Sequence, residues 1–261
     1  MKPLAWVPHP VPLIEGELIG RRKRFFADVR LDDGREVVAH CVNTGRMEGL
    51  VVAGRRVFLS PARPDRKLAY TWELIQEGGQ LVGVNTLMAN RLVGAVLEQR
   101  ALSGLRRYTE LRSEYPYAVR SRVDFHLASK TREHFVEVKN CHLVYPDGFA
   151  YFPDAESERG QRHLAELSEL CRRGRAATVI FTVQRTDARG VRPSDVHDPE
   201  LARAARHAAR AGVRFRALQV RPTREGYSIE RELPVDLEPY DLGSVRAFKD
   251  ELAEEIFRSD A

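Results

Sequence analysis

Two segments of the sequence carry acidic and basic side chains at a spacing that suits phosphate chemistry. Residues 121–127 and 134–140 each alternate apolar and polar residues, which predicts two half-buried strands joined by a short polar hairpin loop. If these strands pair, Asp124, Glu137 and Lys139 converge on one polar face. Two carboxylates beside a lysine suit a hard divalent cation and a phosphodiester substrate.

The same alternation predicts the buried face of the two strands. The core-facing side chains would be Val123, Phe125, Leu127, Val136 and Val138. An ordinary solvated strand face is the alternative interpretation, because alternation of this kind is common in proteins. In that case Lys139 would form only a weak surface pair with Glu137.

A longer motif follows the two strands. Residues 152–164 read FPDAESERGQRHL and resemble the FPDA…ERGQxHL signature of the sugar fermentation stimulation protein (SfsA) family. The resemblance extends from about residue 10 to residue 235. Its other segments are RKRFFADV at 22–29, NTGRM at 43–47, YTWEL at 70–74, GVNT at 83–86 and Ala89-Asn90.

This family resemblance implies an N-terminal OB-like β-barrel joined to an α/β domain of the PD-(D/E)XK nuclease type, with DNA as the ligand. Asp124, Glu137 and Lys139 fall on the nuclease-type motif. The proline that names the motif is absent, since Val123 precedes Asp124. The implied cofactor is Mg²⁺ or Mn²⁺, held by Asp124 and Glu137, because hard cations take oxygen ligands. Lys139 would orient the attacking water or offset the charge that grows on the phosphate oxygens.

Three further residues are candidates for the same site. Nucleases of this type often add an acid from the helix before the sheet, and Glu98 is that residue here unless it is a solvated helix-face glutamate. Arg159 and Gln161 stand in the first turns of a helix predicted over 157–173, where a helix start attracts phosphate. Gln161 would brace Lys139 or reach the substrate.

Basic residues mixed with aromatic rings predict a nucleic-acid surface on the barrel. Residues 21–26 read RRKRFF, so charges would follow phosphates while an exposed ring stacks on bases. The alternative is a charged strand edge, and strand alternation places at least one of Phe25 and Phe26 in the core. The predicted nucleic-acid contacts are Arg22, Lys23, Arg24, Arg46, Arg66, Lys67 and Arg159.

The elements that must position these residues divide the chain near residue 86. Residues 12–86 contain short strands separated by turn signals such as Asp32-Asp-Gly34, which is typical of a small barrel of the OB type. From Met88 the order becomes helix, strands, helix, strand, helix, strand and helix, which indicates an α/β domain, with Asn90 as the expected N-cap of the first helix. We therefore expect a mixed α/β protein with a barrel over 1–86 and a nuclease-type domain over 87–261.

Composition narrows the class of protein. The chain has 261 residues, a formal charge of +5 and a pI of about 9.2, which is compatible with a polyanionic partner. The three cysteines show no CxxC spacing, so neither a disulfide framework nor a zinc site is expected. Prolines interrupt the N-terminal apolar run and no segment has the length of a membrane span, which predicts a cytoplasmic location.

These observations lead to two functional hypotheses. The first is a DNA-binding protein with a metal-dependent nuclease centre that hydrolyses phosphodiester bonds. The second is a non-catalytic, sequence-nonspecific DNA-binding regulator of sugar metabolism that retains a nuclease fold, because a fold alone does not fix activity. The DNA could be single- or double-stranded, and RNA is an alternative ligand because an OB barrel accepts either polymer. The sequence does not determine whether identical chains associate.

Overall fold

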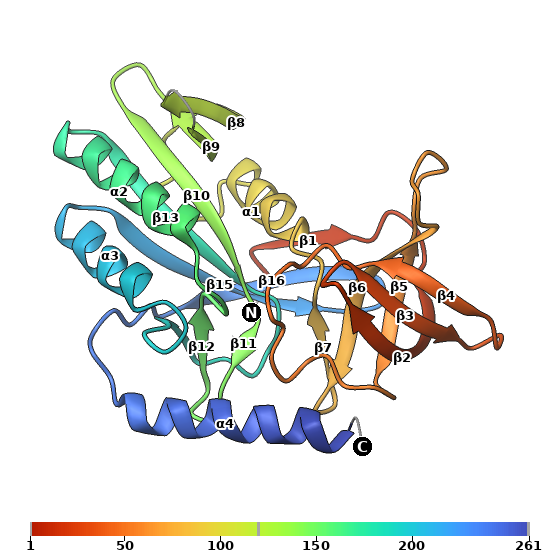
Figure 1. Ribbon diagram of the computed structural model, residues 1–261. Coiled ribbons are helices and arrows are strands. Elements are labelled where there is room, and N and C mark those ends of the chain that lie inside the picture. The colour runs from red at the N-terminus through yellow and green to blue at the C-terminus, as the bar shows by residue number, and fades with distance from the viewer. Residues whose placement is uncertain (1, 119–120, 260–261) are drawn as a thin grey trace.

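The computed structural model describes residues 2–118 and 121–259 and has two parts, a β-barrel and an α/β unit (Figure 1). Five strands form the barrel, in the order β4-β3-β2-β5-β6. The parallel pairing of β4 with β6 closes the ring, and Leu18, Leu59 and Trp72 fill it. The barrel predicted from the short-strand pattern is therefore confirmed. Its strands are β2 (Ile14–Arg22), β3 (Phe26–Leu31), β4 (Glu36–His40), β5 (Arg56–Pro61) and β6 (Tyr70–Glu77), and β7 (Gln80–Gly83) continues from β6 as a hairpin.

The α/β unit is built on a seven-stranded sheet in the order β1-β16-β15-β13-β10-β9-β8. The central strands β10, β13 and β15 run parallel to one another, and the outer neighbours pair antiparallel. The apolar run of β13 is buried along nearly its whole length because helices cover both faces of the sheet. The strands are β1 (Ala5–Pro8), β8 (Glu110–Ala118), β9 (Ser121–Ala128), β10 (Glu133–Cys141), β13 (Ala176–Val183), β15 (Arg214–Pro222) and β16 (Gly226–Leu233).

The first strand differs from the expected assignment of residues 1–86 to the barrel. β1 pairs antiparallel with β16, with Ala5 opposite Ile229, so it forms one edge of the large sheet. β1 ends at Pro8, and Pro10 and Pro12 follow it; proline limits a strand because it has no N–H donor. The chain therefore contributes a strand to the large sheet before it enters the barrel.

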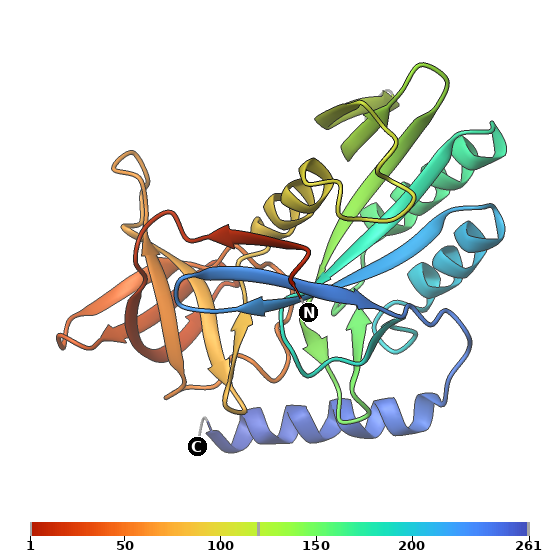
Figure 2. The ribbon, with the colours of Figure 1, turned by 180° about the vertical axis from the view of Figure 1, so that it is seen from behind.

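Four helices complete the described part of the chain, close to the predicted ranges. One face of the large sheet carries α1 (Met88–Glu98), and the other carries α2 (Glu158–Arg172) and α3 (Pro199–Arg210) (Figures 1 and 2). Ser157 caps α2 and Asp198 caps α3, each accepting a hydrogen bond from a backbone N–H of the first turn. No helix in residues 2–118 and 121–259 is long and apolar enough to cross a membrane.

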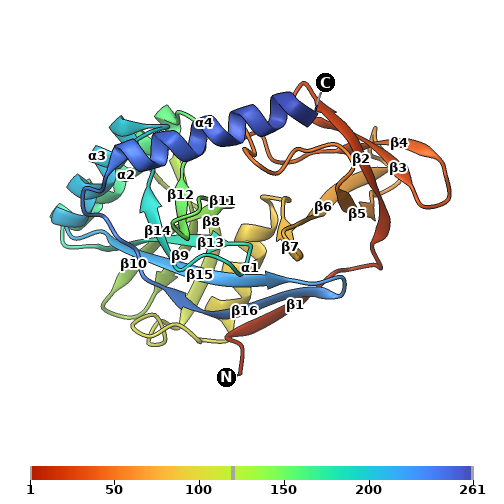
Figure 3. The ribbon, with the colours of Figure 1, turned by 90° about the horizontal axis from the view of Figure 1, so that it is seen from below.

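A small sheet and the last helix join the two parts along their lower side. The sheet contains β11 (Leu143–Val144), β12 (Phe149–Phe152) and β14 (Gly190–Pro193). Seen from below, α4 (Leu242–Ser259) crosses from the side of α3 to the side of β2 (Figure 3). Its residue Val245 is buried against aromatic side chains of the small sheet.

A polar junction also connects the barrel to the α/β unit. The backbone N–H of Met47 donates to Asp154 Oδ2 over 3.1 Å, and Asn43 Nδ2 lies 3.4 Å from His142 Nδ1. Burial opposes the charge of Asp154, but the nearby His142 and the Met47 N–H outweigh it and hold the pKa of Asp154 well below its usual range. A Cβ at Gly45 would clash with the carboxylate of Asp154, so glycine allows the loop to approach this side chain closely.

Candidate active site

The predicted hairpin of β9 and β10 is present, but its pairing stops at Phe125 opposite Val136. Beyond this pair the side chain of Asp124 substitutes for the neighbouring strand, since its Oδ2 accepts a hydrogen bond from the Val138 N–H over 2.7 Å. The carboxylate of Asp124 is therefore fixed beside the backbone that carries Glu137. A side chain that accepts from a strand N–H satisfies a donor that would otherwise lack a partner.

The separation of the strands changes the predicted pattern of faces. Phe125 and Leu127 pack in the core beneath α1, as expected. Val123 instead packs with Phe135 in the core on the side of α2 and α3, so the expectation that it shares a face with Phe125 is wrong. The alternation of β9 breaks at Asp124, where the strand leaves β10.

Asn90 holds the second oxygen of Asp124. Its Nδ2 donates to Asp124 Oδ1 over 2.7 Å. Asn90 lies inside α1, which begins after Leu87 and has no side-chain hydrogen bond at its N-cap. The prediction that Asn90 caps α1 is therefore wrong. Burial and the negative charge of Glu137 raise the pKa of Asp124, while the Val138 N–H, Asn90 and Lys139 oppose this rise.

Glu137 lies at the centre of the site and is only 4% exposed. Its Oε1 accepts from Lys139 Nζ over 2.6 Å and lies 2.6 Å from His163 Nδ1. Burial opposes its ionisation, but His163 and the positive charge of Lys139 outweigh burial and lower the pKa of Glu137. The structure therefore brings Asp124, Glu137 and Lys139 together, as the sequence predicted.

His163 is a residue of the site that the sequence interpretation missed. The buried residues of α2 recur at helical spacing, and His163 lies in that stripe with Gly160, Leu164 and Leu167. A histidine on the buried face of a helix that packs on β13, the neighbour of β10, is a signal that could have been used.

The other predicted members of the site are Glu98, Gln161 and Arg159. Glu98 is exposed and lines the same groove of about 520 Å³ as Asp124. Gln161 donates to the Asp198 carboxylate over 3.0 Å at the start of α3, which differs from the predicted contact with Lys139, and its predicted contact with the substrate stays a prediction. Arg159 is exposed, and its Nε lies 3.4 Å from His163 Nε2.

The donor atoms fit a hard divalent cation. In the described residues no group of three or more His, Cys, Asp or Glu side chains could hold a metal ion, so Glu98 does not complete a three-ligand set with Asp124 and Glu137. Two carboxylates are nevertheless sufficient for Mg²⁺, which usually keeps several waters and takes its remaining ligands from substrate phosphates. The mutual repulsion of Asp124 and Glu137 is what a cation between them would relieve.

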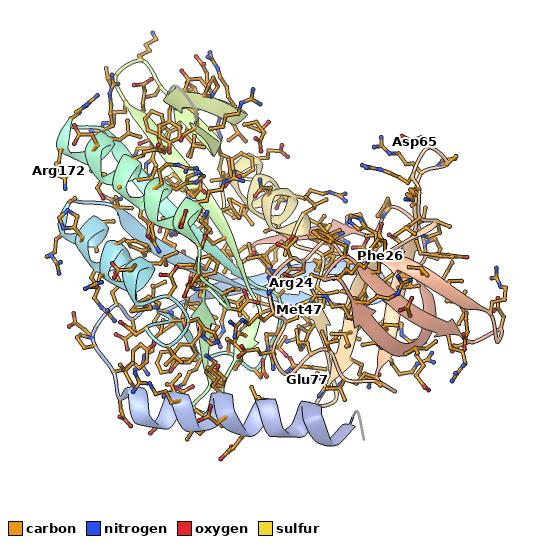
Figure 4. The ribbon with its side chains drawn as sticks, viewed as in Figure 1. Arg24, Phe26, Met47, Asp65, Glu77 and Arg172 are labelled. Carbon is orange, nitrogen blue, oxygen red and sulfur yellow. The ribbon has the colours of Figure 1, made fainter. Side chains whose placement is uncertain are left out.

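The predicted nucleic-acid residues line two separate grooves. Lys23, Arg24 and Arg46 line a groove of about 700 Å³ between the barrel and α4. Arg66 and Lys67 line a second groove of about 450 Å³ on the barrel. Figure 4 shows Arg24 beside Met47 where the barrel meets the α/β unit, and Phe26 on the barrel nearby.

The aromatic residues and Arg22 depart from the expected pattern. Phe25 is 47% exposed and Phe26 is half-buried in the second groove, so neither ring is in the core. Lys23 and Arg24 both have positive φ angles in the tight β2–β3 turn, which interrupts strand alternation at this point. Arg22 is held by Asp28 over 2.8 Å and lies over the Phe26 ring.

Comparison with known proteins agrees with this architecture. A family model described as the SfsA N-terminal OB domain matches residues 19–84, and one described as the sugar fermentation stimulation protein RE domain matches residues 87–226. The chain belongs to the SfsA family. A sugar fermentation stimulation protein homolog of Citrifermentans bemidjiense is 45% identical over 227 residues, which cover 87% of this chain and 98% of that relative.

Other family members are similarly close. The homolog of Geobacter sulfurreducens is 46% identical over 227 residues, which cover 87% of this chain and 97% of that relative. Among solved structures, Pyrococcus furiosus SfsA in complex with Ca²⁺ matches with a TM-score of 0.82 and 28% identity, over 90% of this chain and 100% of that one. The fold of the SfsA family is thus the fold seen here.

Proposed function

We propose that this SfsA-family chain is a DNA-binding nuclease that hydrolyses phosphodiester bonds at a divalent-metal centre formed by Asp124 and Glu137. The observation that carries the proposal is the convergence of the half-buried Asp124 and the buried Glu137 with Lys139, whose Nζ lies 2.6 Å from Glu137 Oε1. Burial of two nearby acids is costly unless something compensates their charges, and such arrangements are typical of functional sites.

Asp124 and Glu137 would hold Mg²⁺ or Mn²⁺ through their oxygens. When bound, the cation would polarise the scissile phosphate and make water a better nucleophile. Lys139 would orient the attacking water and stabilise negative charge on the phosphate oxygens. The related Pyrococcus furiosus protein is described in complex with Ca²⁺, another cation that prefers oxygen ligands, and this supports a cation site in the family.

The barrel groove offers a path for the nucleic acid toward this centre. Arg66 and Lys67 would contact phosphates there, and Phe26 would offer a ring for base stacking. Leu87, the residue immediately before α1, lines this groove, whereas Asn90 in the first turn of α1 lines the groove of Asp124. Helical residues rise by about 1.5 Å each, so a bound strand would need to advance only about 5 Å along α1 to pass from one groove to the other.

Cleavage of labelled single- and double-stranded DNA by the wild type and by Glu137→Ala tests the proposal. We expect hydrolysis that requires Mg²⁺ or Mn²⁺ in the wild type and none in the variant. Shortened products from the variant, or from the wild type in a chelator, would refute the assignment of Glu137. Labelled RNA in the same assay would identify the preferred polymer.

A non-catalytic DNA-binding regulator is a second candidate, and one observation favours it. Oδ1 of Asp124 accepts a hydrogen bond from Asn90, and Oδ2 accepts one from the Val138 N–H. Glu137 is already paired with Lys139. The carboxylates are therefore compensated without a cation. DNA binding by the wild type without hydrolysis of any nucleic acid would select this second function.

A further inference from the structure

We propose that His163 is a positioning residue that fixes which oxygen of Glu137 is offered to the cation. This inference rests on the proposed metal centre but does not require that the centre cleaves DNA. His163 is 3% exposed and its Nδ1 lies 2.6 Å from Glu137 Oε1. The same oxygen accepts from Lys139 Nζ over 2.6 Å.

Two donors at one oxygen orient the whole carboxylate. Oε1 of Glu137 is occupied by His163 and Lys139, whereas Oε2 accepts no hydrogen bond from any residue that the structure describes. The carboxylate therefore presents Oε2 as its free ligand atom. Lys139 alone would orient it less well, because an ammonium on a flexible stem has three rotatable donors.

The neighbouring arginine determines which ring nitrogen of His163 donates. Arg159 Nε donates toward His163 Nε2 over 3.4 Å, and a guanidinium has no acceptor. Nε2 must therefore accept, which leaves the ring proton on Nδ1, where it points to Glu137 Oε1. Arg159, the predicted phosphate contact, is thereby linked to the metal ligand through one imidazole.

Packing of α2 keeps the imidazole in this position. A Cβ at Gly160, one turn before His163, would lie 2.7 Å from Leu201 of α3, so the two helices are in close contact. Leu164 and Leu167 are buried on the same face as His163. Partners that orient metal ligands in this way typically contribute about 10- to 100-fold to metal affinity.

Measurement of the Mn²⁺ dissociation constant without DNA, by electron paramagnetic resonance, tests the proposal. His163→Ala should weaken Mn²⁺ binding by about 10- to 100-fold. His163→Asn should restore binding to within a few-fold of wild type, because its amide nitrogen is two bonds from Cβ, as Nδ1 is. His163→Gln should not restore it, since its nitrogen is one bond farther away.

Ser168→Ala is the matched control, because it removes a buried hydrogen bond of α2 outside the site, from Ser168 Oγ to Leu164 O. Thermal unfolding of the metal-free proteins verifies that each variant folds. Equal Mn²⁺ affinity in wild type and His163→Ala, or equal losses in His163→Ala and His163→Asn, would overturn the role of His163. Mn²⁺ binding without hydrolysis would refute only the nuclease function, whereas a wild type that binds no Mn²⁺ would refute both.

Discussion

At the scale of single residues, Asp124 shows how burial and charge oppose each other in the site. Burial and the charge of Glu137 raise its pKa, yet the Val138 N–H, Asn90 and Lys139 all favour its ionised form. A carboxylate held in this way pays a desolvation cost that a nearby positive charge can offset. Lys139 supplies one such charge, and we propose that a divalent cation supplies another.

Mutation should separate the role of Lys139 in hydrolysis from the role of the carboxylates in metal binding. Lys139→Ala should leave Mn²⁺ binding within a few-fold of wild type, because His163 still donates to Glu137 Oε1. Hydrolysis should fall by about 100- to 1,000-fold, as it does when a group that stabilises the transition state is removed. Mn²⁺ titration and single-turnover cleavage of the same preparation measure both effects. Parallel loss of metal and activity would instead make Lys139 a structural partner of Glu137.

A buried histidine outside the site should make stability depend on pH. Burial, and to a smaller extent the charges of Arg214 and Arg216, lower the pKa of His134 from 6.5 to about 4. Between pH 6.5 and about pH 4, His134 is therefore protonated in the unfolded chain but neutral in the native state. The free energy of unfolding decreases as the pH falls through this window. The loss should approach about 1.4 kcal/mol per pH unit. Urea unfolding at several pH values should show a smaller loss in His134→Asn, and identical slopes would contradict the assignment.

At the scale of elements, the sequence correctly predicted the strands and helices that a short-range pattern of residues determines. Strict alternation predicted the hairpin of 121–127 with 134–140, and helical spacing with capping residues predicted the helix that begins after Ser157. The pairing of β1 with β16 and the packing of Val123 could not be predicted, because both depend on contacts between segments far apart in the chain. The same reason explains the missed partner of Asn90.

In the predicted site too, residues close in the sequence were found and residues from distant segments were missed. The acids and Lys139 lie on two adjacent strands, so the sequence could predict their proximity, although the hydrogen bond from the Val138 N–H to Asp124, rather than strand pairing, connects the strands at the site. His163 and Asn90 reach the site from helices on opposite faces of the sheet, and no local pattern specifies that. Gln161 was a plausible candidate from its motif, but the helix rotation that buries His163 turns Gln161 toward Asp198 of α3.

The loop at 43–47 should act as a rigid connection between the barrel and the α/β unit. Gly45→Ala would place a Cβ against Asp154 and should destabilise the protein by about 1–3 kcal/mol, as overpacked sites usually do. Gly20→Ala is the control, since a Cβ there meets nothing within 4 Å. Thermal unfolding of both variants measures the difference. Equal midpoints would show that the loop moves away from Asp154 without cost.

At the scale of the whole molecule, two basic grooves on one barrel raise the question of which one carries DNA. The groove of Arg66 and Lys67 extends to Leu87, immediately before α1, and α1 lines the groove of Asp124, so the first groove is the expected path. DNA affinity should fall more, and depend less on salt, in Arg66→Ala/Lys67→Ala than in Lys23→Ala/Arg24→Ala. Each lost phosphate contact should reduce the slope of log affinity against log salt by about 0.7–0.9. The reverse order in a salt titration would assign DNA to the groove beside α4.

The proposed nuclease centre requires a divalent cation between two carboxylates that the fold brings together from adjacent strands. Anomalous diffraction from crystals soaked in Mn²⁺ tests this claim most directly. We predict a peak in contact with both Asp124 and Glu137, and its loss from crystals of Asp124→Asn, because a neutral amide removes the charge that holds the cation. Wild-type crystals with no peak between these residues would contradict the metal centre and leave the DNA-binding regulator as the function of this chain.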